Sequence, residues 1–259
     1  MRLVSYNILD GGLERGEKIF RVISSRRPDI VALLEADDAD LVDDLAGKLQ
    51  MDKIWARGNA AHAAAILSRW PIRTSVNHAA LRPAMTNCCL EAVIDDPRGF
   101  PWIVAAIHLH ARAFEKDEQI REIEIAQVLE AMAVYRDGNA RHLLCGDFNS
   151  NSPIQEIDPA RCKPRTREAW QQNGGKIPRR VIQRILDAGY VDTLHRFHGP
   201  AAGRMTTFTT DHPGQRLDYV FTHGFTTPNL RDAWIDPAPP AAEASDHYPV
   251  GVELEVAPQ

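Results

Sequence analysis

Ionisable and amide side chains come directly after apolar, strand-like runs at several places in this 259-residue sequence. A carboxylate held at the edge of a protein core is costly unless it is paired, hydrogen-bonded or bound to a metal. Carboxylate and amide oxygens with imidazoles beside them are the groups that magnesium-assisted phosphoryl chemistry requires. The set comprises Asn7, Glu35, His108 and His110, Asp147 and Asn149, Asp218, and the pair Asp246-His247.

The alternation of an extended chain brings some of these groups onto one face. Residues two apart in a strand share a face, so Asp147 and Asn149 point to one side while Phe148 packs on the other. By the same rule, His108 shares a face with His110. These spacings predict clusters of polar side chains at strand ends.

Each residue taken alone also has a plainer structural explanation. Asn7 suits a turn or a cap, Glu35 could be the N-cap of the helix that follows, and the segment at Asp147 could be an Asx turn. A lone histidine on an apolar strand is commonly a hydrogen-bonded core residue, and Asp246-His247 could be a buried structural turn. The functional interpretation therefore depends on the groups acting together.

At these same residues the sequence resembles the endonuclease/exonuclease/phosphatase superfamily. Its members include apurinic endonucleases, pancreatic-type deoxyribonucleases, neutral sphingomyelinases, inositol polyphosphate phosphatases and deadenylases. The resemblance covers nearly the whole chain and implies a four-layer α/β sandwich, with two mixed β-sheets packed face to face and helices outside. In chain order the matching motifs are Ser5-Tyr6-Asn7, Leu33-Leu34-Glu35, Ile107-His108-Leu109, Gly146-Asp147-Phe148-Asn149, Arg216-Leu217-Asp218-Tyr219 and Ser245-Asp246-His247.

The resemblance implies a metal centre at one side of the site. Glu35 would be the principal ligand of a Mg²⁺ or Mn²⁺ ion, helped by Asn7 and, from the other side, by Asp246. Some nucleases of the superfamily carry a further carboxylate two residues after the Asn7 position. This chain has Leu9 there and Asp10 one position further, so the choice between one metal and two stays open.

The resemblance also implies the groups that act on the phosphate. Asp147 would orient and deprotonate the attacking water, with Asn149 beside it. His247, polarised by Asp218, would donate to a phosphate oxygen or act as general base. His108 would contact the phosphate from the opposite wall. Apurinic endonucleases usually have a tyrosine at the His108 position, which weakens the interpretation as an abasic-site enzyme.

Alternating strand-like and helix-like runs must position these groups. No internal repeat or linker interrupts them, so we expect a single domain over residues 1–259, with a long loop after strand 142–147. The helix pattern at 115–135 predicts an inner face made of Ile120, Ile123, Val128, Leu129 and Met132. Helices are also expected at 15–26, from Leu41 to Leu49 and at 178–188, and strands at 2–8, 29–35, 63–68, 72–79, 88–95, 102–108, 142–147, 206–210, 216–222 and 249–256.

Composition excludes several classes of protein. The chain has 44% hydrophobic and 25% charged residues, which rules out disorder and fibrous repeats. Its net charge of −5 excludes a polycation that coats nucleic acid or an anionic membrane. No apolar stretch is long enough for a membrane span and no leader pattern precedes the first strand, so the expected location is cytoplasmic. The four cysteines have no CxxC spacing, which predicts reduced thiols and no zinc site.

Positive charge is concentrated between Arg161 and Arg184, where eight basic residues accompany one acid, Glu168. A loop leaving the catalytic strand end could bring this segment over the site, to bind non-reacting phosphates or to stack on a base. The alternative is a solvated loop and an ordinary basic helix face. The predicted substrate-binding residues are Arg165, Arg167, Arg179, Arg180 and Trp170.

The sequence thus predicts a divalent-metal-dependent phosphoesterase that hydrolyses a phosphodiester or phosphomonoester by in-line attack of an activated water. Its partner would be a phosphoester substrate, with nucleic acid as an open alternative, and no obligate protein partner is evident. A DNA or RNA endo- or exonuclease is the alternative within the enzyme class. A catalytically silent binding module is the alternative outside it, although such relatives usually lose a metal carboxylate or the terminal Asp-His pair. A cysteine or serine hydrolase lacks support because Cys145 lies inside the strand before Asp147 and no Gly-x-Ser-x-Gly elbow is present.

Overall fold

Two six-stranded mixed β-sheets form the centre of the computed structural model, which describes residues 1–256. The strands of the first sheet are β1 (Arg2–Asn7), β2 (Ile30–Leu34), β3 (Asp52–Arg57), β4 (Ala63–Ser68), β11 (Leu230–Ile235) and β12 (Val250–Leu254). Their order is β11-β12-β1-β2-β4-β3, and β1 and β2 are the parallel pair.

The second sheet has the same plan. Its strands are β5 (Ile72–Asn77), β6 (Cys88–Asp95), β7 (Pro101–His108), β8 (His142–Asp147), β9 (Val191–Asp192) and β10 (Asp218–His223). Their order is β5-β6-β7-β8-β10-β9, and β7 and β8 are the parallel pair. Each sheet therefore has one parallel pair near its centre, and every other pairing is antiparallel.

The two sheets pack against each other through apolar side chains. Leu34 and Ile66 of the first sheet share a buried cluster with Trp102 and Val104 of the second. The strand β2 is apolar at every position and fully buried, as expected for a strand covered on both faces.

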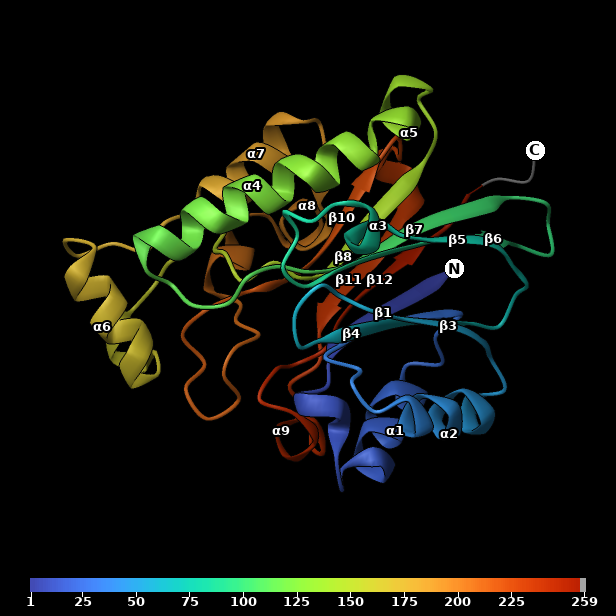
Figure 1. Cartoon of the computed structure of the whole chain (residues 1–259), viewed down its shortest axis with the longest axis horizontal. Helices are drawn as coiled ribbons and strands as arrows, with labels where there is room; N and C mark the ends of the chain where they lie inside the picture. The colour runs from blue at the N-terminus through green and yellow to red at the C-terminus, as the bar shows by residue number, and fades with distance from the viewer. Residues whose placement is uncertain (257–259) are drawn as a thin grey trace.

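Helices cover the outer face of each sheet (Figure 1). On the first sheet lie α1 (Gly16–Ser25), α2 (Ala39–Leu49) and α9 (Ala241–Ala244), and on the second lie α4 (Glu115–Ala131) and α7 (Arg180–Asp187). The remaining helices are α3 (His78–Leu81), α5 (Ala133–Asp137), α6 (Pro164–Gln172) and α8 (Thr193–His198). The predicted four-layer α/β sandwich is confirmed. Within residues 1–256, no helix is both long and apolar enough to cross a membrane.

The inner face of α4 differs from the prediction. Ile123 is 56% exposed, whereas Glu118 and Arg121 are buried. Glu118 accepts hydrogen bonds from Arg121, from the Ser150 hydroxyl and from the backbone N–H of Val181. Because a buried charge is tolerated when it is paired and hydrogen-bonded, the polar stripe of α4 can face inward. These contacts fix α7 and the segment after β8 against α4.

Other differences concern the segments around these strands. The structure has β3 and β11, which the sequence analysis did not predict, and α6 stands where a long loop was expected. The predicted strand at 206–210 is reduced to isolated bridges from Phe208 to Gln215 and His247.

Candidate active site

The predicted site residues gather at one edge of the two sheets. Asn7 ends β1 and Glu35 follows β2, while His108 and Asp147 end β7 and β8. Each of these is a parallel pair, and the carboxyl ends of parallel strands lie at the same edge of a sheet. Asp218 begins β10 and lies opposite Asp147 in the antiparallel register. The fold thus brings residues from five separate sequence motifs together in one cluster.

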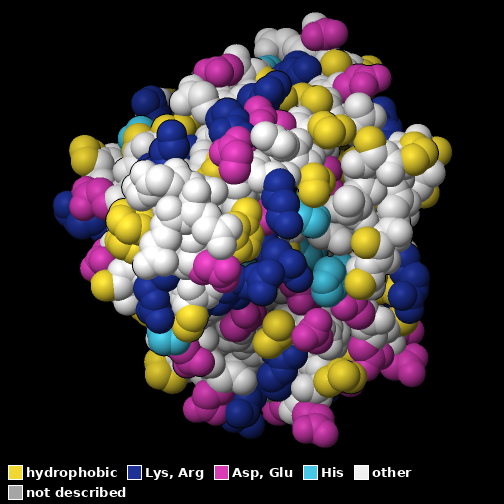
Figure 2. All heavy atoms as spheres, turned by 60° about the vertical axis from the view of Figure 1, so that its left-hand side comes forward, with side chains coloured by type: hydrophobic (Ala, Val, Ile, Leu, Met, Phe, Trp, Pro, Cys, Tyr) yellow, Lys and Arg dark blue, Asp and Glu magenta, His cyan; other side chains and the backbone are white. Residues whose placement is uncertain are grey.

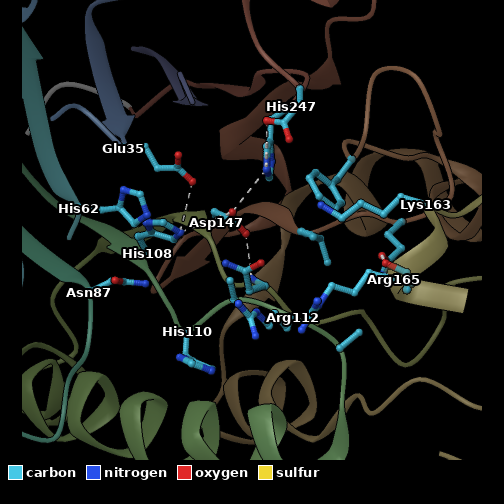
Figure 3. Close-up of a pocket in the computed structure, with 18 of the residues that line it drawn as sticks. Glu35, His62, Asn87, His108, His110, Arg112, Asp147, Lys163, Arg165 and His247 are labelled. Atoms are coloured by element: carbon cyan, nitrogen blue, oxygen red, sulfur yellow. Dashed lines mark hydrogen bonds and ion pairs between the residues drawn. The ribbon is translucent and has the colours of Figure 1, made fainter. Parts of the chain in front are cut away.

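A pocket of about 640 Å³ opens at this edge (Figure 3). The sequence-predicted residues that line it are Glu35, His108, Asp147, Asn149, Arg165, Asp246 and His247, and His110 lines it as well. Asn7 and Asp218 are buried and contact these residues from behind.

Asn7 connects the two carboxylates at the centre of the site. Its side-chain amide donates to Oε1 of Glu35 at 3.0 Å and to Oδ2 of Asp147 at 3.1 Å. Its own oxygen accepts the backbone N–H of Leu9, and Glu35 Oε2 accepts that of Asp10. Burial opposes ionisation of Glu35, but the hydrogen bonds from the Asn7 amide and the Asp10 backbone N–H, with His62 nearby, outweigh it and lower the pKa of the carboxyl. Glu35 is therefore an anion at neutral pH.

His247 and Asp218 form a buried pair. His247 Nδ1 donates to Oδ2 of Asp218 at 2.8 Å, and its Nε2 lies 3.7 Å from Oδ2 of Asp147. Burial disfavours the imidazolium, but the carboxylates of Asp218 and Asp147 outweigh it and raise the pKa of His247 well above its usual value. The ring also packs on Phe208, with 4.6 Å between the ring centroids. His247 is therefore fixed in position and has a proton to donate.

His108 has the opposite character. Burial lowers the pKa of its imidazole to about 4, so the ring is neutral. Its Nε2 lies 3.9 Å from Oε1 of Glu35 and 3.8 Å from Oδ2 of Asp147. Its Nδ1 is buried and has no hydrogen-bond partner in the described part of the chain. The imidazoles of His247 and His108 are thus charged and neutral, respectively.

The backbone at the strand ends is held in unusual conformations. Glu35 and Asn149 have φ values of 52° and 49°, a region that residues other than glycine seldom occupy. Such conformations persist where the surrounding structure enforces them, and they concentrate at functional sites. The Asn149 amide donates to the Leu109 carbonyl at 3.0 Å, and its backbone N–H donates to Oδ1 of Asp147 at 2.9 Å. These two contacts hold the turn after β8.

Gly146 allows β8 to approach β7 directly before Asp147. Its φ is 137°, and a Cβ there would lie 1.9 Å from the carbonyl oxygen of Ile107. We expect Gly146→Ala to push β8 away from β7, which displaces Asp147 and lowers both stability and activity. Thermal unfolding and kcat would be measured together, with Gly47→Ala on exposed helix surface as the control, because a Cβ at Gly47 meets no atom within 4 Å. An unchanged Tm and kcat in Gly146→Ala would contradict this account of the strand approach.

Three basic residues stand at the pocket, and one of them, Arg165, was individually predicted. Lys163 and Arg112 line the pocket as well. Lys163 Nζ lies 3.9 Å from the ring centroid of Phe208, which itself packs on His247. Figure 2 shows Lys and Arg side chains around the hollow in which histidines are visible. This side of the pocket is therefore electropositive.

The other predicted substrate-binding residues are engaged elsewhere. Arg167 donates to the Cys162 carbonyl, and Arg179 donates to the carbonyls of Ser152 and Pro153. Arg180 pairs with two carboxylates of α4. Trp170 lies on α6 beside Gly175 and is not among the residues that line the pocket. The structure thus brings only part of the basic segment to the site.

His62 and Asn87 line the pocket and were missed by the sequence analysis. His62 lies just before β4, and β4 runs antiparallel to β2, so the start of β4 is at the same edge as the end of β2. Only polar residues that follow strands were predicted as site residues. His62 could have been found as a polar residue directly before a strand that pairs antiparallel with β2.

The donor atoms of the pocket fit a divalent cation. Within residues 1–256, Oδ1 of Asp246 is buried and has no hydrogen-bond partner, and the ionised Glu35 lines the same pocket. Carboxylate oxygens with such free acceptor capacity are the ligands that Mg²⁺ and Mn²⁺ take. The metal-binding interpretation of Glu35 and Asp246 is therefore chemically consistent with the structure.

Comparison with known proteins extends over the same residues. A model of the Endonuclease/Exonuclease/phosphatase family matches residues 4–247. Among solved structures, the 3′ phosphatase NExo from Neisseria, bound to a product DNA hairpin, is 20% identical with a TM-score of 0.76, covering 99% of this chain and 100% of that one. An AP endonuclease from Archaeoglobus fulgidus is 18% identical, with the same TM-score and coverage.

The catalytic domain of human Nocturnin, with a bound sulfate anion, is 16% identical with a TM-score of 0.68 and covers 97% of this chain and 93% of that one. At these identities the solved structures show a shared fold. No curated protein matched the sequence.

Proposed function

This chain belongs to the endonuclease/exonuclease/phosphatase family, and we propose that it is a metal-dependent phosphoesterase. Members of the family hydrolyse phosphoester bonds with divalent metal ions. This chain would cleave its substrate by in-line attack of water. The observation that carries this proposal is the joint placement of an ionised Glu35, a buried Asp147 and a protonated His247 around one pocket. A binding module that had lost catalysis would have no need to keep all three.

Glu35 and Asp246 would hold the metal ion, with Asn7 supporting Glu35 through the hydrogen bond that its amide donates. A bound Mg²⁺ or Mn²⁺ supplies Lewis-acid polarisation of a phosphoryl oxygen and offsets its charge. Asn7 also keeps Glu35 and Asp147 in a fixed relation through its two donated hydrogen bonds. The same side chain thereby links the metal-binding and the water-activating parts of the site.

Asp147 would orient the attacking water and accept its proton. Burial, partly offset by His247, raises the pKa of Asp147 to about 7, which suits a proton acceptor near neutral pH. His247 is protonated and would donate to a non-bridging phosphate oxygen, while the neutral His108 would contact the phosphate from the other wall. Asn149 would position the water beside Asp147.

The basic side of the pocket would bind parts of the substrate that do not react. Lys163, Arg165 and Arg112 line the pocket and can contact additional phosphates or other anionic groups. A nuclease activity is the second candidate, because two of the solved relatives are a 3′ phosphatase bound to a DNA hairpin and an AP endonuclease.

A substrate panel tests this proposal. The purified chain would be incubated with p-nitrophenyl phosphate, bis-p-nitrophenyl phosphate, a DNA hairpin with a 3′-phosphate and a duplex with an abasic site, each with Mg²⁺, with Mn²⁺ and with EDTA. We expect metal-dependent hydrolysis of at least one class that EDTA abolishes. Hydrolysis of none of them, by a folded chain with metal bound, would contradict the proposal.

Neutralising the pocket cations should weaken binding of polyanionic substrates. For Lys163→Gln/Arg165→Gln we expect KM for an oligonucleotide to rise about tenfold or more, because charge-assisted hydrogen bonds to phosphate are lost. KM for p-nitrophenyl phosphate should change little, since the metal-binding residues are untouched.

The matched control is Arg180→Gln/Arg184→Gln, which removes the same charge from side chains that pair with Glu122. Equal effects of the two double variants on oligonucleotide KM would show that the pocket cations have no specific role.

A further inference from the structure

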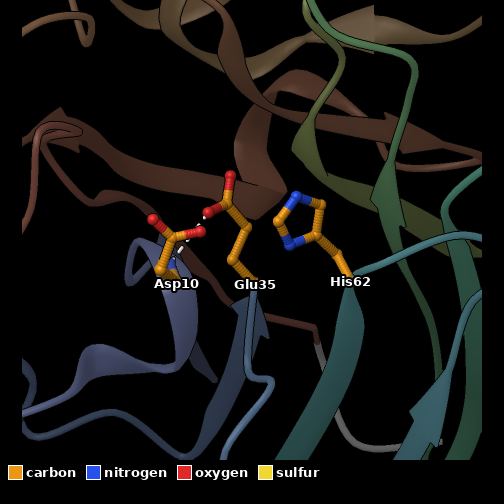
Figure 4. A group of neighbouring side chains, drawn as sticks. All are labelled: Asp10, Glu35 and His62. Atoms are coloured by element: carbon orange, nitrogen blue, oxygen red, sulfur yellow. Dashed lines mark hydrogen bonds between the residues drawn. The ribbon is translucent and has the colours of Figure 1, made fainter.

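The imidazole of His62 lies beside the proposed metal site and takes no part in the mechanism proposed above. Asp10, Glu35 and His62 each offer one ligand atom, and these three atoms lie within 4.8 Å of one another. Figure 4 shows the three side chains converging from the segment after β1, the end of β2 and the start of β4. Glu35 is held for this arrangement, because its Oε2 accepts the backbone N–H of Asp10 at 2.9 Å.

Asp37 fixes the ring of His62. The Nδ1–H of His62 donates to Oδ2 of Asp37 at 2.9 Å, and Oδ1 of Asp37 accepts the backbone N–H of Ala63 at 2.7 Å. Because an ionised carboxylate only accepts, Nδ1 carries a proton and Nε2 is the nitrogen left for another partner. A carboxylate bonded to the far nitrogen is the usual support of a metal-binding histidine, since it orients the ring and raises its basicity.

The charges around the His62 ring also favour the binding of a cation. Three carboxylates, those of Asp10, Glu35 and Asp37, lie around the ring of His62, and the nearby ring of His108 has its centroid 5.2 Å away. Glu35 and His62 are only 14% and 24% exposed, so water screens their charges incompletely. A divalent ion between Glu35 and His62 would offset this excess of negative charge.

We propose that His62 and Asp10 join Glu35 as metal ligands, and that the imidazole nitrogen makes this site prefer a first-row transition-metal ion over Mg²⁺. The inference rests on the proposed function, which places the metal at Glu35. Mg²⁺ takes oxygen ligands and waters, whereas imidazole favours the later divalent metals, whose affinity for nitrogen rises from Mn²⁺ through Co²⁺. Asp10 supplies the additional carboxylate one residue beyond Leu9, where the sequence pattern had left the ligand set open.

Co²⁺ is a suitable probe for this chain. Its visible absorption responds to the replacement of an oxygen ligand by nitrogen, so it reports the ligand set directly. The four cysteines, Cys88, Cys89, Cys145 and Cys162, are all buried, so thiolates do not compete for the added ion.

The test measures metal affinity independently of catalysis. Titration calorimetry of the full chain with CoCl₂ and with MgCl₂ would be run on the wild type, His62→Asn and Asp37→Asn. The control is His195→Asn, which removes an exposed histidine on α8. We expect the wild type to bind Co²⁺ more tightly than Mg²⁺. His62→Asn should raise the Kd for Co²⁺ about 10–100-fold, with a much smaller change for Mg²⁺ and an altered Co²⁺ absorption band.

Two further variants test the same metal-ligand set. Asp37→Asn should weaken Co²⁺ binding in the same direction, because the ring loses its carboxylate partner. Should His62→Asn fail to fold, Asp10→Asn removes an exposed ligand and should also raise the Kd for Co²⁺. An unchanged ratio of the Co²⁺ and Mg²⁺ Kd values in folded His62→Asn would overturn the inference.

Failure of the proposed function gives a different result. If the chain hydrolyses phosphoesters with Mg²⁺ but its preference for Co²⁺ over Mg²⁺ does not depend on His62, only this inference is contradicted. A chain whose Co²⁺ binding depends on His62 but that hydrolyses no phosphoester with any metal contradicts the proposed function and supports the metal site.

Discussion

Asp147→Asn is expected to lower kcat by about 10²–10³-fold or more, while the chain stays folded. The substitution keeps the volume of the side chain and one acceptor oxygen for the Asn149 backbone N–H, but it removes the group that would take the proton from water. The measurement is metal-dependent turnover of the best substrate, with circular dichroism to verify the fold. Asp187→Asn, an exposed position on α7, is the matched control.

Glu35→Gln should be similarly damaging for a different reason. It removes the charge of the proposed metal ligand, so turnover should fall and the metal concentration needed for half-maximal activity should rise. For Asp147→Asn the metal requirement should change less. Wild-type rates in either folded variant at saturating metal would refute the assigned roles.

The loss caused by Asp218→Asn should act mainly through His247. The carboxylate of Asp218 accepts the Nδ1–H of His247 at 2.8 Å and is the largest source of its raised pKa after the opposing effect of burial. Groups that act as a unit are not additive. The double variant Asp218→Asn/His247→Ala should therefore be little worse than His247→Ala alone.

The double-mutant cycle needs kcat/KM for the wild type, both single variants and the double variant. A matched cycle with Asp192→Asn in place of Asp218→Asn tests specificity, because Asp192 binds the buried Arg216 and not His247. Additive losses from Asp218 and His247 would mean that the pair seen in the structure has no joint function.

Much of the fold and of the pocket could be predicted from the sequence. The apolar runs indicate where the strands lie, and the polar residues at their ends indicate the site. Apolar runs of five to eight residues such as those of β2 and β7 are buried on both faces, so their positions are readable without partners. Since the polar groups follow the carboxyl ends of such runs, Glu35 and Asp147 could be placed at one edge from the sequence alone.

The parts that were not predicted depend on partners far away in sequence. Arg180 pairs with Glu115 and Glu122, 65 and 58 residues away, so nothing in its local pattern distinguished it from Arg165. The same holds for α4, where Glu118 is buried only because Arg121 and the segment around Val181 satisfy it. Pro164 at the start of α6 is a helix-initiation signal that was interpreted as loop composition.

The most direct test of the account is the fate of solvent oxygen during turnover. The wild type would hydrolyse its best phosphoester in ¹⁸O-labelled water with Mg²⁺ or Mn²⁺, and mass spectrometry would locate the label. Attack of an activated water on phosphorus predicts one labelled oxygen in the phosphate product of each turnover and none in the alcohol. It also predicts no reaction in EDTA, and incorporation of label slowed about 10²–10³-fold in Asp147→Asn. Label in the alcohol, or hydrolysis that persists in EDTA, would contradict the account.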